Sequence, residues 1–287
     1  LHVVTSAIEH DAVLAPCRRL EAEGVRVTYL RPNRQGFIEA ASLAKALTDD
    51  TVLVSVQAAN SEVGAIQPIR ELAALAHERG ALFHTDAVQA LGKMPLNLQE
   101  LDVDAASFSA HKIGGPKGIG ALYAGANVRH IRPLLHGGGQ EAGTRSGTEA
   151  TAQIAGFAKA VELRADGLAD KLAHMAEVKK YCKEKLLSID GVVAVGQGEA
   201  PHILMVSLVG YPSANVVTEL GAQGICLSAG SACHRGKLSH VVTALGLDKR
   251  TAGGVLRISF GPDTTFAHID ALYEALLQHK NTRFPML

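Results

Sequence analysis

Short apolar, β-branched runs alternate with segments of helical periodicity through the first half of the chain. The runs are typical of strands buried on both faces of a parallel sheet and cover residues 2–5, 25–30, 51–57 and 81–85. The helical segments between them cover residues 10–23, 40–47 and 68–79. Gly24 and Gly80 suit helix ends, and Pro68 suits a helix start. This alternation predicts an α/β fold with a mostly parallel sheet flanked by helices.

A lysine follows the next strand-like run in a turn rich in glycine. Residues 105–109 predict a strand, Lys112 lies just beyond it, and residues 120–124 predict a further strand. Glycines in the turn allow positive φ and close backbone approach. Next to Ser109 and His111, Lys112 is a candidate amine nucleophile for a carbonyl cofactor or substrate. The alternative is a solvated lysine on a surface turn.

An aspartate ends the apolar run before this loop. Asp86 follows residues 81–85, and Gln89 comes three residues later. A lysine together with an aspartate that faces a pyridine nitrogen is the signature of a pyridoxal phosphate site. Ligands of parallel sheets bind beyond the carboxyl ends of the strands. We therefore expect one rim of the sheet to gather His10, Asn60, Asp86, Gln89 and residues 109–112.

The second half of the chain has a different pattern. Residues 148 to about 189 are helical in pattern, with a break at Gly167. Further on, strands are expected at residues 192–195, 202–208, 225–227 and 255–260, and helices at 213–220 and 266–279. We expect a large cofactor-binding domain over residues 1–166 and a small α+β domain over 167–287. Thr148, which follows a glycine-rich segment, is a candidate cap for the helix, and such helix starts favour anions.

Two side chains of the second half suggest chemistry. Cys233 lies among small residues beside His234 and Arg235, a setting that exposes a thiol and favours thiolate; an inert loop thiol is the alternative. Cys226 has apolar neighbours, and we expect it in the core. Arg257 lies within an apolar strand, so it needs a carboxylate partner from the protein or from a substrate.

Composition narrows the function classes. The 287 residues carry 28 basic and 28 acidic side chains, so the formal net charge is zero, and no basic cluster indicates nucleic acid or an anionic membrane. No apolar run approaches the ~20 residues that cross a bilayer. We expect no signal peptide, and the four cysteines form no C-x-x-C pair. We therefore expect a cytoplasmic protein with reduced thiols and no metal site.

Seven segments, taken in order, resemble the cysteine desulfurases of the class V aminotransferase family. They are TSAIEH, NSEVGAIQ, HTDAVQ, SFSAHKIGGPKGIGALY, TRSGT, SAGSAC and LRISFG. The resemblance implies a homodimer with pyridoxal 5'-phosphate that converts L-cysteine to L-alanine and leaves a persulfide on Cys233. The sulfur would pass to an acceptor protein, a scaffold or a sulfur carrier, for iron–sulfur cluster or thio-cofactor assembly. A selenocysteine lyase or another class V enzyme is the alternative, as is a degenerate paralogue that acts as a binding partner.

The resemblance also implies roles for residues around the cofactor. Lys112 would attach the cofactor and move the proton at the substrate Cα. Asp86 would hold the pyridine nitrogen protonated, His10 would stack on the ring, and Gln89 would bind the phenolate oxygen. Phosphate contacts are implied for Ser109, His111 and, from the other subunit, Thr148.

The same resemblance implies the substrate contacts, and it also shows one departure of this sequence from the family pattern. Asn60 and Arg257 would hold the substrate carboxylate, with Asn60 also counted among the cofactor contacts, and Cys233 would take the sulfur. The family usually has a further segment before the first strand, with a Thr-rich turn that contacts the phosphate. No equivalent occurs in these 287 residues. We therefore expect weakened phosphate binding and an apolar face left uncovered.

Overall fold

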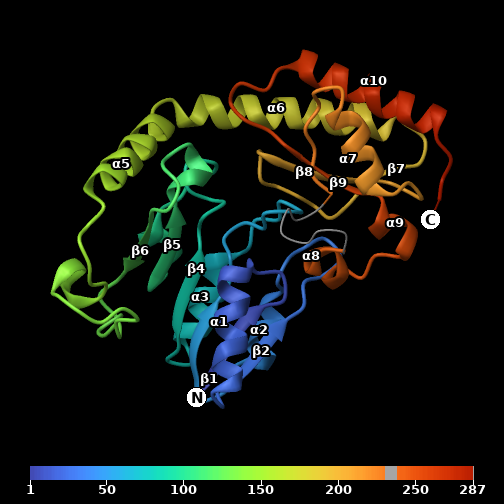
Figure 1. Ribbon diagram of the computed structural model, residues 1–287. Helices are drawn as coiled ribbons and strands as arrows, with labels where there is room; N and C mark the ends of the chain where they lie inside the picture. Colours follow the sequence, from blue (N-terminus) through green and yellow to red (C-terminus); the bar gives the residue numbers. More distant parts are fainter. Residues whose placement is uncertain (230–237, 287) are drawn as a thin grey trace.

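The larger of two sheets has six strands and supports the candidate site. The computed structural model describes residues 1–229 and 238–286 (Figure 1). The strands are β1 (His2–Ser6), β2 (Arg26–Leu30), β3 (Thr51–Ser55), β4 (Leu82–Asp86), β5 (Ala105–Ser109) and β6 (Gly120–Ala124). Their order is β2-β1-β3-β4-β5-β6, and only β6 runs antiparallel to its neighbour. The predicted α/β fold is confirmed.

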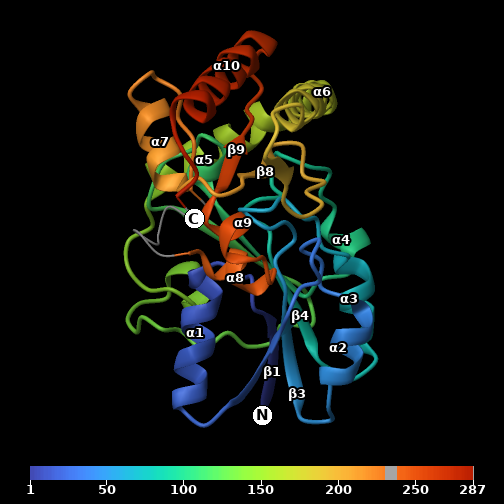
Figure 2. The same cartoon turned by 90° about the vertical axis from the view of Figure 1, so that its right-hand side faces the viewer.

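Helices cover both faces of this sheet. They are α1 (Asp11–Ala22), α2 (Ala40–Ala46), α3 (Ile69–His77) and the short α4 (Leu98–Leu101). Figure 2 shows α1 on one side of the sheet and α2 and α3 on the other. Leu43 of α2 and Leu72 of α3 are fully buried against Val54 and Phe83 of the strands. Burial of this apolar layer stabilises the sheet whose carboxyl ends carry the candidate residues.

Two consecutive helices connect this sheet to the second half of the chain. The short turns η1 (Ala110–Ile113) and η2 (Gln140–Gly143) precede α5 (Thr151–Ala165) and α6 (Leu168–Leu187). Phe157 of α5 packs on Ile113 of η1, so α5 supports the lysine turn. The prediction that Thr148 caps the helix was wrong, because the N-cap of α5 is Ala150, which makes no side-chain capping bond.

The second sheet has three antiparallel strands in the order β7-β8-β9. They are β7 (Val192–Ala194), β8 (Ile203–Leu208) and β9 (Val255–Ser259), with helices α7 (Ser213–Gly221), α8 (His240–Ala244), α9 (Lys249–Gly253) and α10 (Phe266–Thr282). The predicted strand at 225–227 does not form: only Ser228 pairs with Arg257, as an isolated bridge. The expected burial of Cys226 was also wrong, since this thiol is exposed. No helix of the described chain has the length and apolarity needed to cross a membrane.

The halves are joined by an apolar group that we call the inter-sheet cluster. Its members are Val63, Ala65, Val195, Met205, Val242, Leu245, Ala252 and Val255. Separately, α6 and α10 lie side by side over the second sheet (Figure 1) and bury residues such as Val178 and Leu272 with it. Gly167 lies between α5 and α6 in the left-handed region, at φ 56°. We propose that the domain boundary lies there, with residues 1–166 in the large domain and 167–287 in the small one.

Candidate active site

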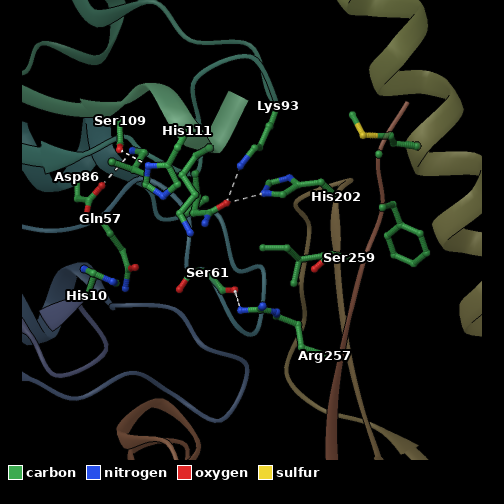
Figure 3. Close-up of a pocket in the computed structure, with 18 of the residues that line it drawn as sticks. His10, Gln57, Ser61, Asp86, Lys93, Ser109, His111, His202, Arg257 and Ser259 are labelled. Atoms are coloured by element: carbon green, nitrogen blue, oxygen red, sulfur yellow. Dashed lines mark hydrogen bonds between the residues drawn. The ribbon is translucent and has the colours of Figure 1, made fainter. Parts of the chain in front are cut away.

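A cavity of about 670 Å³ lies beyond the carboxyl ends of β1, β3, β4 and β5 (Figure 3). From the first sheet and its loops it takes His10, Gln57, Ser61, Asp86, Gln89, Lys93, Ser109, His111 and Lys112. The rest of the chain adds Arg164, His202, Ile203, Arg257, Ser259 and Phe260, among others. Parallel strands deliver the residues that follow them to one edge, and the second sheet closes the space from the opposite side.

Lys112 lies in the short turn that follows β5. Gly114 ends this turn at φ 87°, and a side chain on Gly120 would bring its Cβ to 2.5 Å from the carbonyl oxygen of Phe108. Both positions therefore require glycine, which explains part of the glycine-rich pattern. Lys112 is exposed to the cavity, and its amine forms no hydrogen bond or ion pair with any residue that the structure describes. The amine is free to react.

Ser109 and His111 form a pair beside this lysine. The Ser109 hydroxyl and His111 Nδ1 lie 2.8 Å apart. Partial burial, together with the positive charges of Lys112, Lys117 and Lys93, lowers the pKa of His111. A neutral imidazole has one N–H, so this pair keeps one free donor for an anionic oxygen: His111 Nε2–H if Ser109 donates to Nδ1, or the Ser109 O–H if Nδ1–H donates to Ser109.

Asp86 is half-buried at the end of β4. Its Oδ1 accepts from the backbone N–H of Val88 at 3.0 Å, and no described residue donates to its Oδ2. Two residues earlier, His84 bridges Ser55 and Ser107, with both ring nitrogens 2.8 Å from a hydroxyl. This chain of bonds ties β3, β4 and β5 together next to Asp86. Burial lowers the pKa of His84, so the bridge is neutral and places no positive charge next to Asp86.

His10 and Glu9 lie at the start of α1. His10 is the N-cap, where its Nδ1 accepts from the N–H of Ala12 at 3.1 Å, and its ring lines the cavity. Glu9 is fully buried behind it, and Glu9 Oε1 accepts from the Ser6 hydroxyl and from the N–H of Gln57 at 3.0 Å. Glu9 Oε2 has no partner, and burial raises the pKa of Glu9 to about 8. Sequence reasoning assigned no role to Glu9.

Three predicted residues are not placed in this cavity. Asn60 is fully buried and does not line it: Asn60 Nδ2 donates to the Ile8 carbonyl at 3.0 Å, and Oδ1 accepts from two backbone N–H groups of its own turn. Its amide therefore organises the loop after β3, and this position does not support a direct substrate contact. Thr148 is exposed elsewhere on the chain. Cys233 lies outside the described residues.

Arg257 projects from β9 into the cavity. Its Nη1 donates to the Ser61 carbonyl at 3.1 Å, while its Nε is buried without a partner. Arg257 makes no ion pair within residues 1–229 and 238–286. Burial lowers the pKa of Arg257, and the charge of Glu62 opposes this shift. A buried guanidinium with an unpaired donor favours a carboxylate supplied by a ligand.

Lys93 and His202 are the site residues that sequence reasoning missed. Gln89 Oε1 accepts from Lys93 Nζ at 2.9 Å and lies 3.2 Å from His202 Nε2. Burial and the charges of Lys112, Arg164 and Arg257 lower the pKa of Lys93 to about 8. The spacing of four residues between Gln89 and Lys93 was the one available signal. No sequence signal linked His202 to Gln89, because His202 lies next to β8 in the second sheet.

Comparison with known proteins agrees with this arrangement. The family model described as aminotransferase class-V matches residues 1–272. A cysteine desulfurase IscS of Clostridium botulinum is 39% identical over 282 residues, which cover 96% of this chain and 71% of the relative. The cysteine desulfurase IscS of Vibrio campbellii is 41% identical over 280 residues, with 96% and 69% covered.

Solved structures show the same similarity. A NifS-like protein superposes with a TM-score of 0.91 at 35% identity, covering 98% of this chain and 75% of the other. The structure described as SspA in complex with cysteine gives a TM-score of 0.77 at 34% identity, with 92% and 74% covered. The family match extends over nearly the whole chain and includes both sheets and every described cavity residue. The chain therefore belongs to the class-V aminotransferase family.

Proposed function

We propose that this chain is a pyridoxal 5'-phosphate-dependent cysteine desulfurase. It converts L-cysteine to L-alanine and takes the sulfur as a persulfide on Cys233. One observation carries the proposal: the free amine of Lys112 and the unpartnered Oδ2 of Asp86 line the same cavity. The identity of about 40% with cysteine desulfurases supports the choice of reaction.

The charges of the cavity suit this cofactor and substrate. Its lining contains four lysine and arginine side chains, namely Lys93, Lys112, Arg164 and Arg257. Asp86 is the single carboxylate among the described lining residues. A phosphate and a substrate carboxylate would balance this positive excess, and the one carboxylate could accept from a ring N–H.

The residues present then have distinct tasks. Bound pyridoxal phosphate supplies an electron sink that stabilises negative charge at the substrate Cα. Lys112 Nζ would take up and return the Cα proton, and Asp86 Oδ2 would accept from the ring N–H and keep it protonated. His10 would cover one face of the ring, and the Ser109–His111 pair would donate to the phosphate through the one hydrogen that its internal bond leaves free. The position of these residues around one cavity and the family resemblance support these assignments.

The substrate end of the cavity has its own residues. Arg257 lines this end of the cavity, and its guanidinium would donate to the substrate carboxylate. The Cys233 thiolate attacks the substrate sulfur, the carbon–sulfur bond breaks, and its electron pair is protonated at Cβ, which leaves alanine. The persulfide passes to an acceptor protein for iron–sulfur cluster or thio-cofactor assembly.

A spectrum and a product assay test this function. The purified chain, incubated with pyridoxal phosphate and dialysed, should absorb visible light, and L-cysteine should change this band while alanine forms in equal amount to the sulfur released. A chain that binds the cofactor but gives no alanine with a reductant present would refute the desulfurase assignment. Absence of any visible band would refute the cofactor itself.

We further propose a homodimer. Large apolar side chains are exposed on β6, on the segment before α5 and on α5 itself: Leu122 (55%), Leu134 (94%), Leu135 (52%) and Leu163 (58%). A second copy would cover them, and Thr148, from the same region, would then reach the phosphate of the partner. Light scattering should give twice the chain mass of 30.1 kDa, and Leu134→Asp should reduce it to the monomer. The cytoplasmic location stays a prediction from the cysteine pattern.

A further inference from the structure

Three side chains converge at the wall of the cavity that faces the second sheet. Lys93 follows Gln89 by one helical turn's length of chain, and His202 immediately precedes β8. Figure 3 shows dashed lines from Lys93 and from His202 that meet at one oxygen, which is Gln89 Oε1. We infer that Lys93 and His202 are positioning residues that fix the orientation of the Gln89 amide, so that its N–H group faces the cofactor.

The hydrogen-bond donors of Lys93 and His202 determine which atom of the Gln89 amide faces them. A lysine ammonium has three donors and no acceptor, so the atom of Gln89 that it contacts is the carbonyl oxygen. His202 faces the same oxygen at 3.2 Å, so its Nε2 carries the proton and donates as well. Two donors on one oxygen favour this orientation of the amide. In the flipped orientation, the Gln89 N–H₂ group would face the N–H groups of Lys93 and His202.

The protonation of His202 agrees with this orientation. The ring is buried, and burial together with the charges of Lys93, Lys179 and Arg257 lowers the pKa of His202 to about 3. The imidazole is therefore neutral and has one N–H, which Gln89 uses. The other nitrogen, Nδ1, is buried without a partner. Because Nδ1 carries no hydrogen in this tautomer, no buried N–H donor is left unpaired.

The consequence lies on the other side of the amide. Gln89 Nε2 has no partner among the described residues, and Gln89 lines the cavity. A fixed N–H donor there binds an anionic oxygen, whereas a flipped amide would oppose it with a carbonyl oxygen. This inference rests on the proposed function, in which that anionic oxygen belongs to the cofactor ring.

A double-mutant cycle on cofactor affinity tests the inference. Titration of the cofactor-free protein with pyridoxal phosphate would be compared for wild type, Lys93→Met, Gln89→Ala and the double variant. Loss of one hydrogen bond predicts a roughly 3- to 10-fold weaker affinity for each single variant. The double variant should be no weaker than Gln89→Ala, because Lys93 acts through Gln89. Losses that multiply would show that Lys93 acts on the ligand directly, and would overturn the inference.

A second measurement needs no cofactor. In nitrogen-15 spectra of the cofactor-free protein, the Gln89 side-chain N–H₂ signals should shift in Lys93→Met and stay in place in Lys45→Met, an exposed lysine on α2. Unmoved signals in Lys93→Met would overturn the inference. If Lys93→Met fails to fold, variants of His202 test the same inference. His202→Gln can still donate near the Nε2 position and should keep the affinity for pyridoxal phosphate, whereas His202→Ala should weaken it. Equal loss in both would count against orientation.

These outcomes separate the inference from the function beneath it. If wild-type protein binds no pyridoxal phosphate, the proposed function and the inference both fail. If wild-type protein binds pyridoxal phosphate and forms alanine, but the affinity losses of the two single variants multiply in the double variant, only the orienting role of Lys93 and His202 fails.

Discussion

The strongest test of substrate recognition is Arg257→Lys. The guanidinium has one bond to the Ser61 carbonyl, and its Nε has no partner in the cavity wall. Lysine keeps the charge but loses the planar pair of donors that matches a carboxylate. We expect the loss of one charge-assisted hydrogen bond, about 1.5–3 kcal/mol, which corresponds to a roughly 10- to 150-fold weaker affinity for cysteine.

The assay is a titration with L-cysteine that follows the visible band of the bound cofactor. Cofactor affinity should hardly change, because Arg257 does not contact the proposed phosphate or ring sites. Arg250→Lys, at an exposed arginine of α9, is the matched control and should leave both affinities unchanged. Thermal unfolding of each variant checks that the loss of the Ser61 bond has not disturbed the fold. Normal cysteine affinity in Arg257→Lys would refute the assigned role of Arg257.

Three further predictions address other parts of the site. Borohydride should fix the cofactor to the protein, and peptide mapping should find it on Lys112; labelling of Lys117 instead would contradict the site. Cys233→Ser should bind cysteine and change its spectrum but form little alanine, and unimpaired alanine production would exclude Cys233 as the sulfur acceptor. Because the pKa of buried Glu9 is raised to about 8, the folded state holds this proton more tightly than the unfolded state. The stability that Glu9 contributes is therefore fully present below about pH 4.5 and is lost as pH rises towards 8. Glu9→Gln should remove this fall and stabilise the protein by on the order of 4 kcal/mol at pH 8, measured by urea unfolding; an unchanged pH dependence would show that Glu9 is ionised in the fold.

Much of the site could be predicted from the sequence because topology alone brings it together. In a parallel sheet, residues that follow different strands share one edge whatever their separation along the chain. His10 follows β1, Asp86 and Gln89 lie at and after the end of β4, and Lys112 follows β5; all four line the cavity. Their chemical roles stay predictions, since those depend on a ligand as well as on position.

The rest depended on contacts that no local pattern contains. His202 meets Gln89 only because the second sheet docks on the first, and periodicity along a strand carries no information about docking. Cys226 has apolar neighbours in sequence and was therefore expected in the core. The described residues around it contribute one isolated bridge, between Ser228 and Arg257, so no strand forms there and the thiol is exposed. Asn60 follows a strand as expected, but its amide is used by the backbone of its own loop, and sequence position cannot distinguish that use from a ligand contact.

The inter-sheet cluster has a consequence for how ligands enter. A hinge motion that parted the two sheets would expose Val63, Met205 and Leu245, and each such side chain costs about 1.5–3 kcal/mol to bring into water. Opening by domain separation is therefore too rare to admit ligands, and the two halves should move as one rigid body. Cofactor and cysteine must enter by the open side of a cavity that is already formed. Small-angle scattering should accordingly give the same radius of gyration with and without both ligands, for protein held in one oligomeric state.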